Sequence, residues 1–307
     1  MRRAQGQPPC TLSSTTAGEL MLATAAASTE NWVLLEVTGG WAPKAPATRG
    51  LPSAVTNLWA HVAQTPRARM LFIKQKPRTS PSRRIFIGNS GKDPWWITWS
   101  LPNLEAVGEI DIDAIWKGQI PAVAEAVTEP LYLVCTHGKR DACCAKFGIA
   151  MYRALCDQNA ARVWQASHIG GHRFAATLLA FPTGHCFGRL APADAQPLYE
   201  AFENHSLWSL GHIRGRTMYN RPEQAAIQFL RQHLSQTEVT GIELTSPATI
   251  STAGNEWTVR LKAQHQHYVV TVKSTPGKEI FGSCFKEKRQ AALQWSASIQ
   301  HSHSDRG

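Results

Sequence analysis

The order of apolar segments between residues 131 and 202 constrains the fold of this chain more than any other feature. Leu131 to Val134 is a short apolar run, as expected for a buried strand, and residues 144–156 carry apolar side chains at helical spacing. The next expected elements are a strand over Arg162 to Ser167, hairpin strands over Phe174 to Phe181 and Cys186 to Leu190, and a helix after Asp194. The order strand, helix, strand, strand, strand, helix predicts a thioredoxin-like domain of the α/β class.

The chain is long enough for two modest domains, and its 307 residues divide into five regions. We expect a disordered N-terminus over 1–16, an N-terminal α/β domain over 17–129, the thioredoxin-like domain over 130–235, a C-terminal β-rich extension over 236–300 and a polar tail over 301–307. No internal repeat is evident.

The two outer regions carry their own element patterns. In the N-terminal region, strands are expected over Val33 to Val37, Met70 to Lys74, Arg84 to Ile87 and Trp95 to Trp99, with a helix within Leu51 to Val62. At the other end, an amphipathic helix after Pro222 is followed by a pair of alternating strands, Glu256 to Lys262 and His267 to Lys273. The expected architecture is therefore a smaller α/β half, the thioredoxin-like domain, and a C-terminal helix with a β-hairpin extension.

The cysteines favour metal or redox chemistry over structural disulfides. Seven cysteines are too few for a disulfide scaffold, and their odd number argues further against one. Three of them crowd together at Cys135, Cys143 and Cys144. No segment approaches the roughly 20 apolar residues that span a bilayer, and no secretory apolar run follows the N-terminal arginines. We therefore expect a cytoplasmic protein with no membrane partner.

The net charge of +10 is concentrated near a proline-bearing loop between two expected strands. The basic residues there are Arg67, Arg69, Lys74, Lys76, Arg78, Arg83 and Arg84. The segment is interpreted as a solvated loop or as a docking surface for an acidic redox partner. A nucleic-acid partner is not expected, because no helix-turn-helix, ribonucleoprotein or zinc-finger pattern accompanies the charge.

Cys135 and Cys144 are placed where a metal ligand belongs. Cys135 ends the expected buried strand, and Cys144 opens the expected helix, with eight residues between them. A thiolate at a helix N-terminus is favoured by the helix dipole and by free backbone N–H groups. Lys139 and Arg140 favour the ionised sulfur further.

His168 and His172 supply two more candidate ligands. Gly170 and Gly171 between them make a helix unfavourable, so we expect a tight loop after the strand. Two imidazoles on such a loop can close on one metal ion. The spacing leaves two kinds of metal open: a zinc ion, the usual occupant of a Cys2His2 set, or a 2Fe–2S cluster, which suits the wide spacing of the cysteines.

These segments resemble the sucrase/ferredoxin-like family, whose fungal members are thioredoxin-like ferredoxins with C-x8-C and H-x-G-G-H motifs. The motif residues are Leu131 to Cys144 and His168 to His172. The likeness extends to Phe181 to Gly184, Gly188-Arg189, Arg214 to Arg216 and Trp32 to Trp41. It covers most of residues 15–235, while the C-terminal part of the chain matches weakly.

The resemblance implies a 2Fe–2S cluster held by Cys135, Cys144, His168 and His172, with the cysteines on one iron and the histidines on the other. His137, Cys143, Gly170 and Gly171 are interpreted as second-shell residues, Cys143 as inert or modulatory. The remaining cysteines, Cys10, Cys156, Cys186 and Cys284, are interpreted as core or surface residues. No sucrase activity is expected, because no carboxylate pair is placed for glycoside hydrolysis.

The leading functional hypothesis is one-electron transfer as a carrier or redox sensor, with a reductase or flavoprotein as partner. Histidine ligands raise the potential to about −150 to +300 mV in Rieske-type centres. They also make it fall with pH, by up to about 59 mV per unit for a one-electron, one-proton step. Two alternatives stay open: a thiol–disulfide oxidoreductase on the same scaffold, and a zinc-stabilised binding module.

Overall fold

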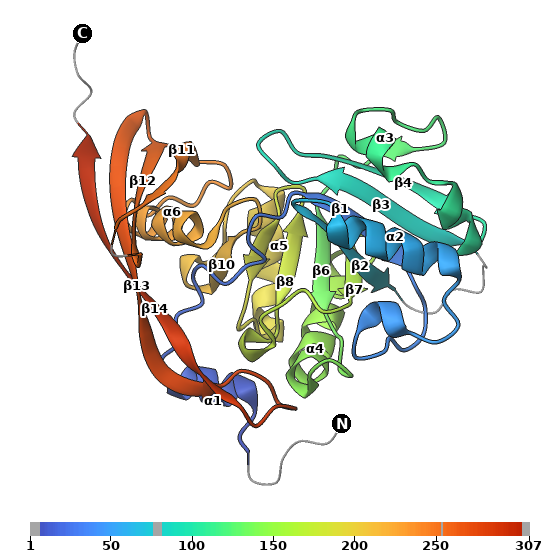
Figure 1. Ribbon diagram of the computed structural model, residues 1–307, viewed down its shortest axis with the longest axis horizontal. Helices are drawn as coiled ribbons and strands as arrows, with labels where there is room; N and C mark the ends of the chain where they lie inside the picture. The colour runs from blue at the N-terminus through green and yellow to red at the C-terminus, as the bar shows by residue number, and fades with distance from the viewer. Residues whose placement is uncertain (1–6, 76–81, 253, 303–307) are drawn as a thin grey trace.

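A ten-stranded mixed sheet forms the centre of the molecule in the computed structural model, which describes residues 7–75, 82–252 and 254–302 (Figure 1). The strand order is β10-β9-β8-β6-β7-β2-β1-β3-β4-β5. The strands are β1 (Asn31–Glu36), β2 (Ala68–Lys74), β3 (Arg83–Asn89), β4 (Trp95–Leu101), β5 (Glu125–Ala126), β6 (Leu131–Cys135), β7 (Val163–Ala166), β8 (Leu178–Phe181), β9 (His185–Phe187) and β10 (Ile213–Arg216). The α/β fold class expected from the sequence is confirmed.

Six helices occur among the described residues, and α2 and α4 pack on the large sheet. The six are α1 (Cys10–Thr16), α2 (Ser53–Gln64), α3 (Ile112–Trp116), α4 (Ala142–Asn159), α5 (Ala195–Glu203) and α6 (Arg221–His233). Local sequence sets where two of them begin. The Asp141 side chain accepts a hydrogen bond from the Cys143 N–H at the start of α4. Asn220 and Glu223 form a capping box at the start of α6.

The sheet contains the same strand topology twice. In the second half, β6 is parallel to β7 and antiparallel to β8, and β8 is antiparallel to β9. In the first half, β1 is parallel to β2 and antiparallel to β3, and β3 is antiparallel to β4. Helices α2 and α4 occupy equivalent crossovers. The thioredoxin-like order expected once therefore occurs twice, although the sequence shows no evident repeat.

The two halves share one sheet through an antiparallel contact between β2 and β7, which pairs Ile73 with Ala166. Their cores meet there as well, because Trp32 and Leu34 of β1 pack in one cluster with Leu133 of β6. The boundary placed between residues 129 and 130 therefore crosses a continuous sheet, and the division into two domains stays a prediction.

A second sheet follows α6 in the order β11-β12-β13-β14. Its strands are β11 (Ile242–Ile250), β12 (Glu256–Ala263), β13 (Gln266–Phe281) and β14 (Arg289–Ser302). Two of them, β12 and β13, contain the expected strand pair. The long β13–β14 hairpin leaves the sheet and runs back to α1, at the opposite end of the molecule (Figure 1).

Three local expectations differ from the structure. Residues 1–16 were expected to be disordered, but within the described part of this segment Cys10–Thr16 form α1, with Cys10 and Ser14 buried. The strand expected from Phe174 begins only at Leu178, because His172–Phe174 form a 3-10 turn. Of the polar tail, Ser302 still ends β14, and residues 303–307 lie outside the described residues.

Candidate metal centre

Two elements bring the first two candidate ligands together. Cys135 is the last residue of β6, and Cys144 lies in the first turn of α4. The two side chains are almost completely buried. Helix α4 packs very closely on the end of β6, because a Cβ added to Gly148 would lie 2.1 Å from the Cys135 carbonyl oxygen. This close approach places both sulfurs in one pocket.

The two thiols share a proton. The Cys144 thiol donates a hydrogen bond to Cys135, and this bond lowers the pKa of Cys135 well below its usual value despite burial. His168 and the backbone N–H of His137 lower it further. The same contact with Cys135, together with burial, raises the pKa of Cys144. Cys135 is therefore the more readily ionised of the two thiols, and a metal bound here displaces the protons that the pair retains.

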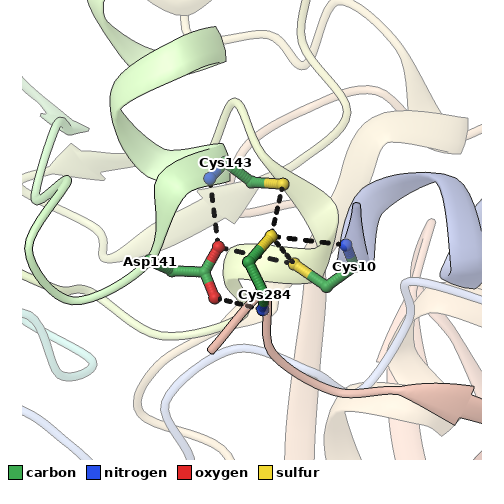
Figure 2. A group of neighbouring side chains, drawn as sticks. All are labelled: Cys10, Asp141, Cys143 and Cys284. Atoms are coloured by element: carbon green, nitrogen blue, oxygen red, sulfur yellow. Dashed lines mark hydrogen bonds between the residues drawn. The ribbon is translucent and has the colours of Figure 1, made fainter. Parts of the chain in front are cut away.

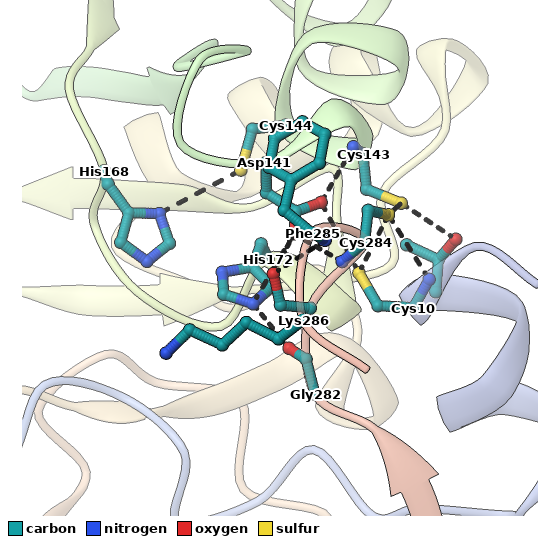
Figure 3. Close-up of polar contacts among 12 residues, drawn as sticks. Cys10, Asp141, Cys143, Cys144, His168, His172, Gly282, Cys284, Phe285 and Lys286 are labelled. Carbon is teal, nitrogen blue, oxygen red and sulfur yellow. Dashed lines mark hydrogen bonds and ion pairs between the residues drawn. The ribbon is translucent and has the colours of Figure 1, made fainter. Parts of the chain in front are cut away.

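His168 joins the two cysteines, as the sequence predicts. Its Nδ1, on the loop that follows β7, lies 3.9 Å from Cys135 Sγ. The same nitrogen lies 4.0 Å from Cys144 Sγ (Figure 3). Because β6 and β7 are parallel, their carboxyl ends meet at the same edge of the sheet. Cys135, Cys144 and His168 form a group whose ligand atoms all lie within 4.8 Å of one another.

His137 orients this loop rather than directing its side chain to a sulfur. The His168 N–H donates to His137 Nδ1 over 3.2 Å, and His137 Nε2 lies 2.8 Å from the Ala42 carbonyl oxygen. The first bond makes Nδ1 an acceptor, so Nε2 carries the proton that is donated to Ala42. Burial lowers the pKa of His137, which keeps this neutral form. Its interpretation as a second-shell residue agrees with these contacts.

The loop between the histidines has the tight geometry that its glycines predict. Gly170 has φ +100° and Gly171 has φ +70°. Arg69 donates to the carbonyl oxygens of His168 and Ile169, at 2.7 and 3.3 Å. Arg214 donates to the next carbonyl oxygen, that of Gly170, at 3.1 Å.

These two guanidinium groups hold three successive carbonyls of the ligand loop. Arg214 is 1% exposed, so its charge faces the interior near Cys135. The sequence analysis did not assign either arginine to the site. For Arg214, the sequence feature that could have indicated a role in the site was the resemblance over Arg214-Gly-Arg216. For Arg69, the sequence offered only its positive charge.

His172 lies beside this group rather than in it. The centroid of its ring is 5.1 Å from that of His168, and its Nε2 bonds the Gly282 carbonyl oxygen. Its Nδ1 is buried and has no hydrogen-bond partner. Burial lowers the pKa of His172, which favours the neutral imidazole that a metal requires. An unpartnered buried nitrogen next to the imidazole of His168 suits the expected ligand set of two thiolates and two histidines.

A basic hollow opens next to His172. Seven lysine and arginine side chains line it, and none of the described residues lining it is acidic. They are Lys44, Lys139, Arg140, Arg173, Lys286, Lys288 and Arg289. Lys286 and Lys288 lie in the β13–β14 loop and Arg289 begins β14, so the C-terminal extension forms part of the surface around the centre. Of the basic segment singled out in the sequence, only Arg69 reaches the site; residues 76–81 lie outside the described residues.

Four residues that the sequence did not connect are brought together in a second group. Cys10 of α1 and Cys284 of the β13–β14 loop meet Cys143 and Asp141 at the start of α4 (Figure 3). Cys10 and Cys284 had been interpreted as ordinary core or surface residues, and Cys143 as inert or modulatory. Cys156 and Cys186 lie outside both groups.

The fold and the site define a class of protein: an α/β protein of thioredoxin-like topology with a candidate Cys/His metal centre at the carboxyl ends of two parallel strands. The family model for sucrase/ferredoxin-like proteins matches residues 22–215, well over half of the chain. The chain therefore belongs to the sucrase/ferredoxin-like family, as the motifs predicted.

One relative shares part of this region. "Altered inheritance of mitochondria protein 32" of Meyerozyma guilliermondii is 29% identical over 96 residues, which are 28% of this chain and 34% of that protein. The match thus spans about a third of the relative. No solved structure matches the chain. Among the described residues, every helix is too short or too polar to cross a membrane.

Proposed function

We propose that this protein binds a 2Fe–2S cluster through Cys135, Cys144, His168 and His172 and transfers single electrons. The observation that carries the proposal is the convergence of two buried thiols and a histidine, with the unpartnered Nδ1 of His172 beside them. A bound cluster would supply a one-electron couple, tuned by its ligands and by nearby hydrogen bonds. The described residues contribute burial, hydrogen bonds to the ligand loop, and the positive charge of Arg214.

Burial argues against the thiol–disulfide alternative. Exchange requires a thiolate that an incoming disulfide can reach. The pKa of Cys135 is lowered by Cys144 beside it, but the two residues are only 1% and 0% exposed. His168 and His172, the neighbouring candidate ligands, are partly exposed. An electron can pass from buried sulfurs to the protein surface, whereas a substrate disulfide cannot reach them.

The basic hollow supports a redox partner with an acidic face. The hollow opens at His172, a proposed ligand, and its seven cations would attract carboxylates on a docking protein. A partner seated there would lie next to an imidazole ligand rather than next to the buried cysteines. We therefore propose that electrons enter or leave on the histidine side.

The first experiment is anaerobic purification followed by an absorption spectrum and iron, sulfide and zinc analysis. Two irons and two sulfides per chain at this site, with visible charge-transfer bands, are expected. Cys135→Ser and His168→Ala should each remove most of the iron. Cys156→Ser and His61→Ala are matched controls, since both lie outside the site, and they should retain it. A zinc ion lost in Cys135→Ser, in a colourless protein, would instead support the binding-module alternative.

A second experiment tests histidine ligation directly. In His172→Cys the cluster should persist with a lower potential and a weaker dependence of that potential on pH, because a thiolate replaces a protonatable imidazole. Potentiometric titration at several pH values measures both quantities. An unchanged curve would contradict the assignment of His172 as a ligand.

A further inference from the structure

A second group of metal-binding side chains lies on the other side of the first turn of α4. It consists of Cys10, Asp141, Cys143 and Cys284, whose ligand atoms all lie within 4.8 Å of one another (Figure 2). Cys143 and Cys144 are adjacent on the helix, and adjacent helical residues point in different directions. Cys144 therefore faces the first centre, while Cys143 faces this second group.

Three distant segments of the chain supply the group. Cys10 begins α1, Asp141 and Cys143 open α4, and Cys284 lies in the loop between β13 and β14. Cys143 Sγ is 3.3 Å from Cys284 Sγ, and Cys284 Sγ is 3.6 Å from Cys10 Sγ. Four ligands around a tetrahedral zinc ion have sulfurs about 3.8 Å apart, from a Zn–S distance of about 2.3 Å. The sulfurs are thus already close to that spacing.

Burial and the surrounding residues also suit a structural ion. All four side chains are at most 2% exposed. Ala175, Phe147 and Phe285 pack around the thiols and separate them from solvent. A closed apolar shell with a complete ligand set is typical of structural rather than catalytic zinc sites.

We propose that Cys10, Cys143, Cys284 and Asp141 bind one Zn²⁺ ion that fastens α1 and the β13–β14 loop to α4. Three thiolates select a borderline-soft ion such as zinc over magnesium or calcium. Zn²⁺ would replace the thiol protons, which are released to solvent. Cys10 and Cys284 lie outside the residues 22–215 that match the family model, so two of the four ligands come from segments outside the family's motifs.

Asp141 has the lone pairs needed for the fourth position. Its Oδ2 accepts from the Cys284 N–H at 2.8 Å and from the Ser283 hydroxyl at 3.0 Å. Its Oδ1 accepts from the Cys143 N–H at 3.0 Å and from the Cys10 thiol at 3.5 Å. When Cys10 ionises, Oδ1 loses the thiol bond and gains a free lone pair facing the sulfurs. The backbone donors keep the carboxylate in this orientation.

Two simpler explanations of this group are a disulfide and apolar filling of the core. The number of sulfurs argues against both. A disulfide would use two of the three thiols and leave the third buried beside it, and the present Sγ–Sγ distances exceed a bond length of about 2.05 Å. Apolar filling does not account for three thiols from distant segments that converge beside one carboxylate, to which the Cys10 thiol donates. One divalent ion explains all four side chains together.

The test begins with metal analysis of the purified wild-type chain. About one zinc ion per chain is expected, in addition to the iron and sulfide of the first centre. Cysteine alkylation and mass spectrometry without reductant should show no disulfide among Cys10, Cys143 and Cys284. A zinc-free wild-type protein, or a disulfide within this group, would overturn the proposal.

Variants assign the ion to the site. Cys10→Ser and Cys284→Ser should reduce zinc to less than about a tenth of the wild-type content, while most of the iron remains. Cys156→Ser, on α4 but outside both groups, should keep both metals. In Cys135→Ser the pattern should reverse, with iron lost and zinc retained. Zinc retention in both Cys10→Ser and Cys284→Ser would refute the assignment, and so would loss of iron in place of zinc.

The wild-type protein alone decides the question if these variants do not fold. Titration with a mercurial thiol reagent should release the zinc as three protected thiols react, and the melting temperature should fall as zinc leaves. Release of zinc without any change in the accessibility of Cys10 and Cys284, mapped by alkylation, would place the ion elsewhere and overturn the proposal.

Discussion

At the scale of single residues, the ligand loop depends on Gly171 because Arg214 occupies the space of a side chain. A Cβ at Gly171 would lie 2.2 Å from Arg214 Nη2, and the backbone is in the left-handed region. Arg214 cannot withdraw easily, since its guanidinium also bonds Thr24 and the Gly170 carbonyl. A buried arginine and a glycine thus form one unit that sets the path from His168 to His172.

Gly171→Ala should therefore displace the loop and lower the iron content of the protein several-fold. Gly170→Ala is the matched control: its φ of +100° is also strained, but no atom lies within 4 Å of the added Cβ. Strain of about 1–2 kcal/mol should lower the melting temperature of the control without a comparable loss of iron. Iron analysis and thermal melts measure both effects. Equal iron loss in the two variants would contradict the role given to Arg214.

A buried histidine away from the metal centre makes stability depend on pH. Burial, with repulsion from Arg216 and Arg231, lowers the pKa of His185 well below its ordinary value of 6.5. The unfolded chain therefore binds a proton that the folded chain does not, so this contribution to stability is present above pH 6.5 and is lost as the pH falls below it.

We expect the free energy of unfolding of the wild type to fall more steeply below pH 6.5 than that of His185→Gln. Denaturant melts of both proteins across this range measure the difference. The comparison isolates His185 from the other titrating groups, because these are common to the two chains. If the difference in free energy of unfolding between the two proteins does not change with pH, His185 is not the source of the pH dependence.

At the scale of elements, helix α4 links both groups of sulfurs. Its first turn contains Cys143 and Cys144, and its N-cap Asp141 bonds the β13–β14 loop through Ser283 and Cys284. Its second turn packs on the end of β6 through Gly148. The position of this helix therefore sets the geometry of both groups.

Gly148→Ala should destabilise the protein, although alanine is the better helix former by about 1 kcal/mol. The new methyl group would lie 2.1 Å from the Cys135 carbonyl oxygen and would push α4 from β6. Iron content and melting temperature should both fall. Ala150→Gly, at an exposed position of the same helix, should lower only the melting temperature. A Gly148→Ala protein that is more stable and fully loaded with iron would disprove the close packing.

At the scale of the whole molecule, the C-terminal extension contributes side chains to the hollow beside the candidate metal centre, although it is distant from the candidate ligands in sequence. The β13–β14 hairpin reaches back past α1 and brings Lys286, Lys288 and Arg289 to the hollow beside His172 (Figure 1). These residues lie beyond the region that matches the family model. The extension therefore shapes the basic surface offered to a redox partner.

Reversing two of these charges should slow electron transfer with an acidic protein partner. We expect Lys286→Glu with Lys288→Glu to lower the second-order rate about tenfold or more at low salt, with a smaller effect at high salt. Lys117→Glu with Lys262→Glu makes the same change in net charge on exposed residues outside the hollow. Stopped-flow reduction measures the rates. Equal slowing by both pairs would attribute the effect to net charge rather than to this surface.

The sequence by itself determined the family, the order of elements in residues 131–202 and the placement of Cys135, Cys144 and His168 around one pocket. Such features follow from local patterns: apolar runs, helical spacing, and glycines that permit a tight loop. It did not determine the second thioredoxin-like strand order, the two arginines behind the loop, or the meeting of Cys10 with Cys143 and Cys284. These depend on the β2–β7 pairing and on the hairpin that returns to α1. Contacts between residues so far apart leave no local pattern, and only the tertiary structure decided them.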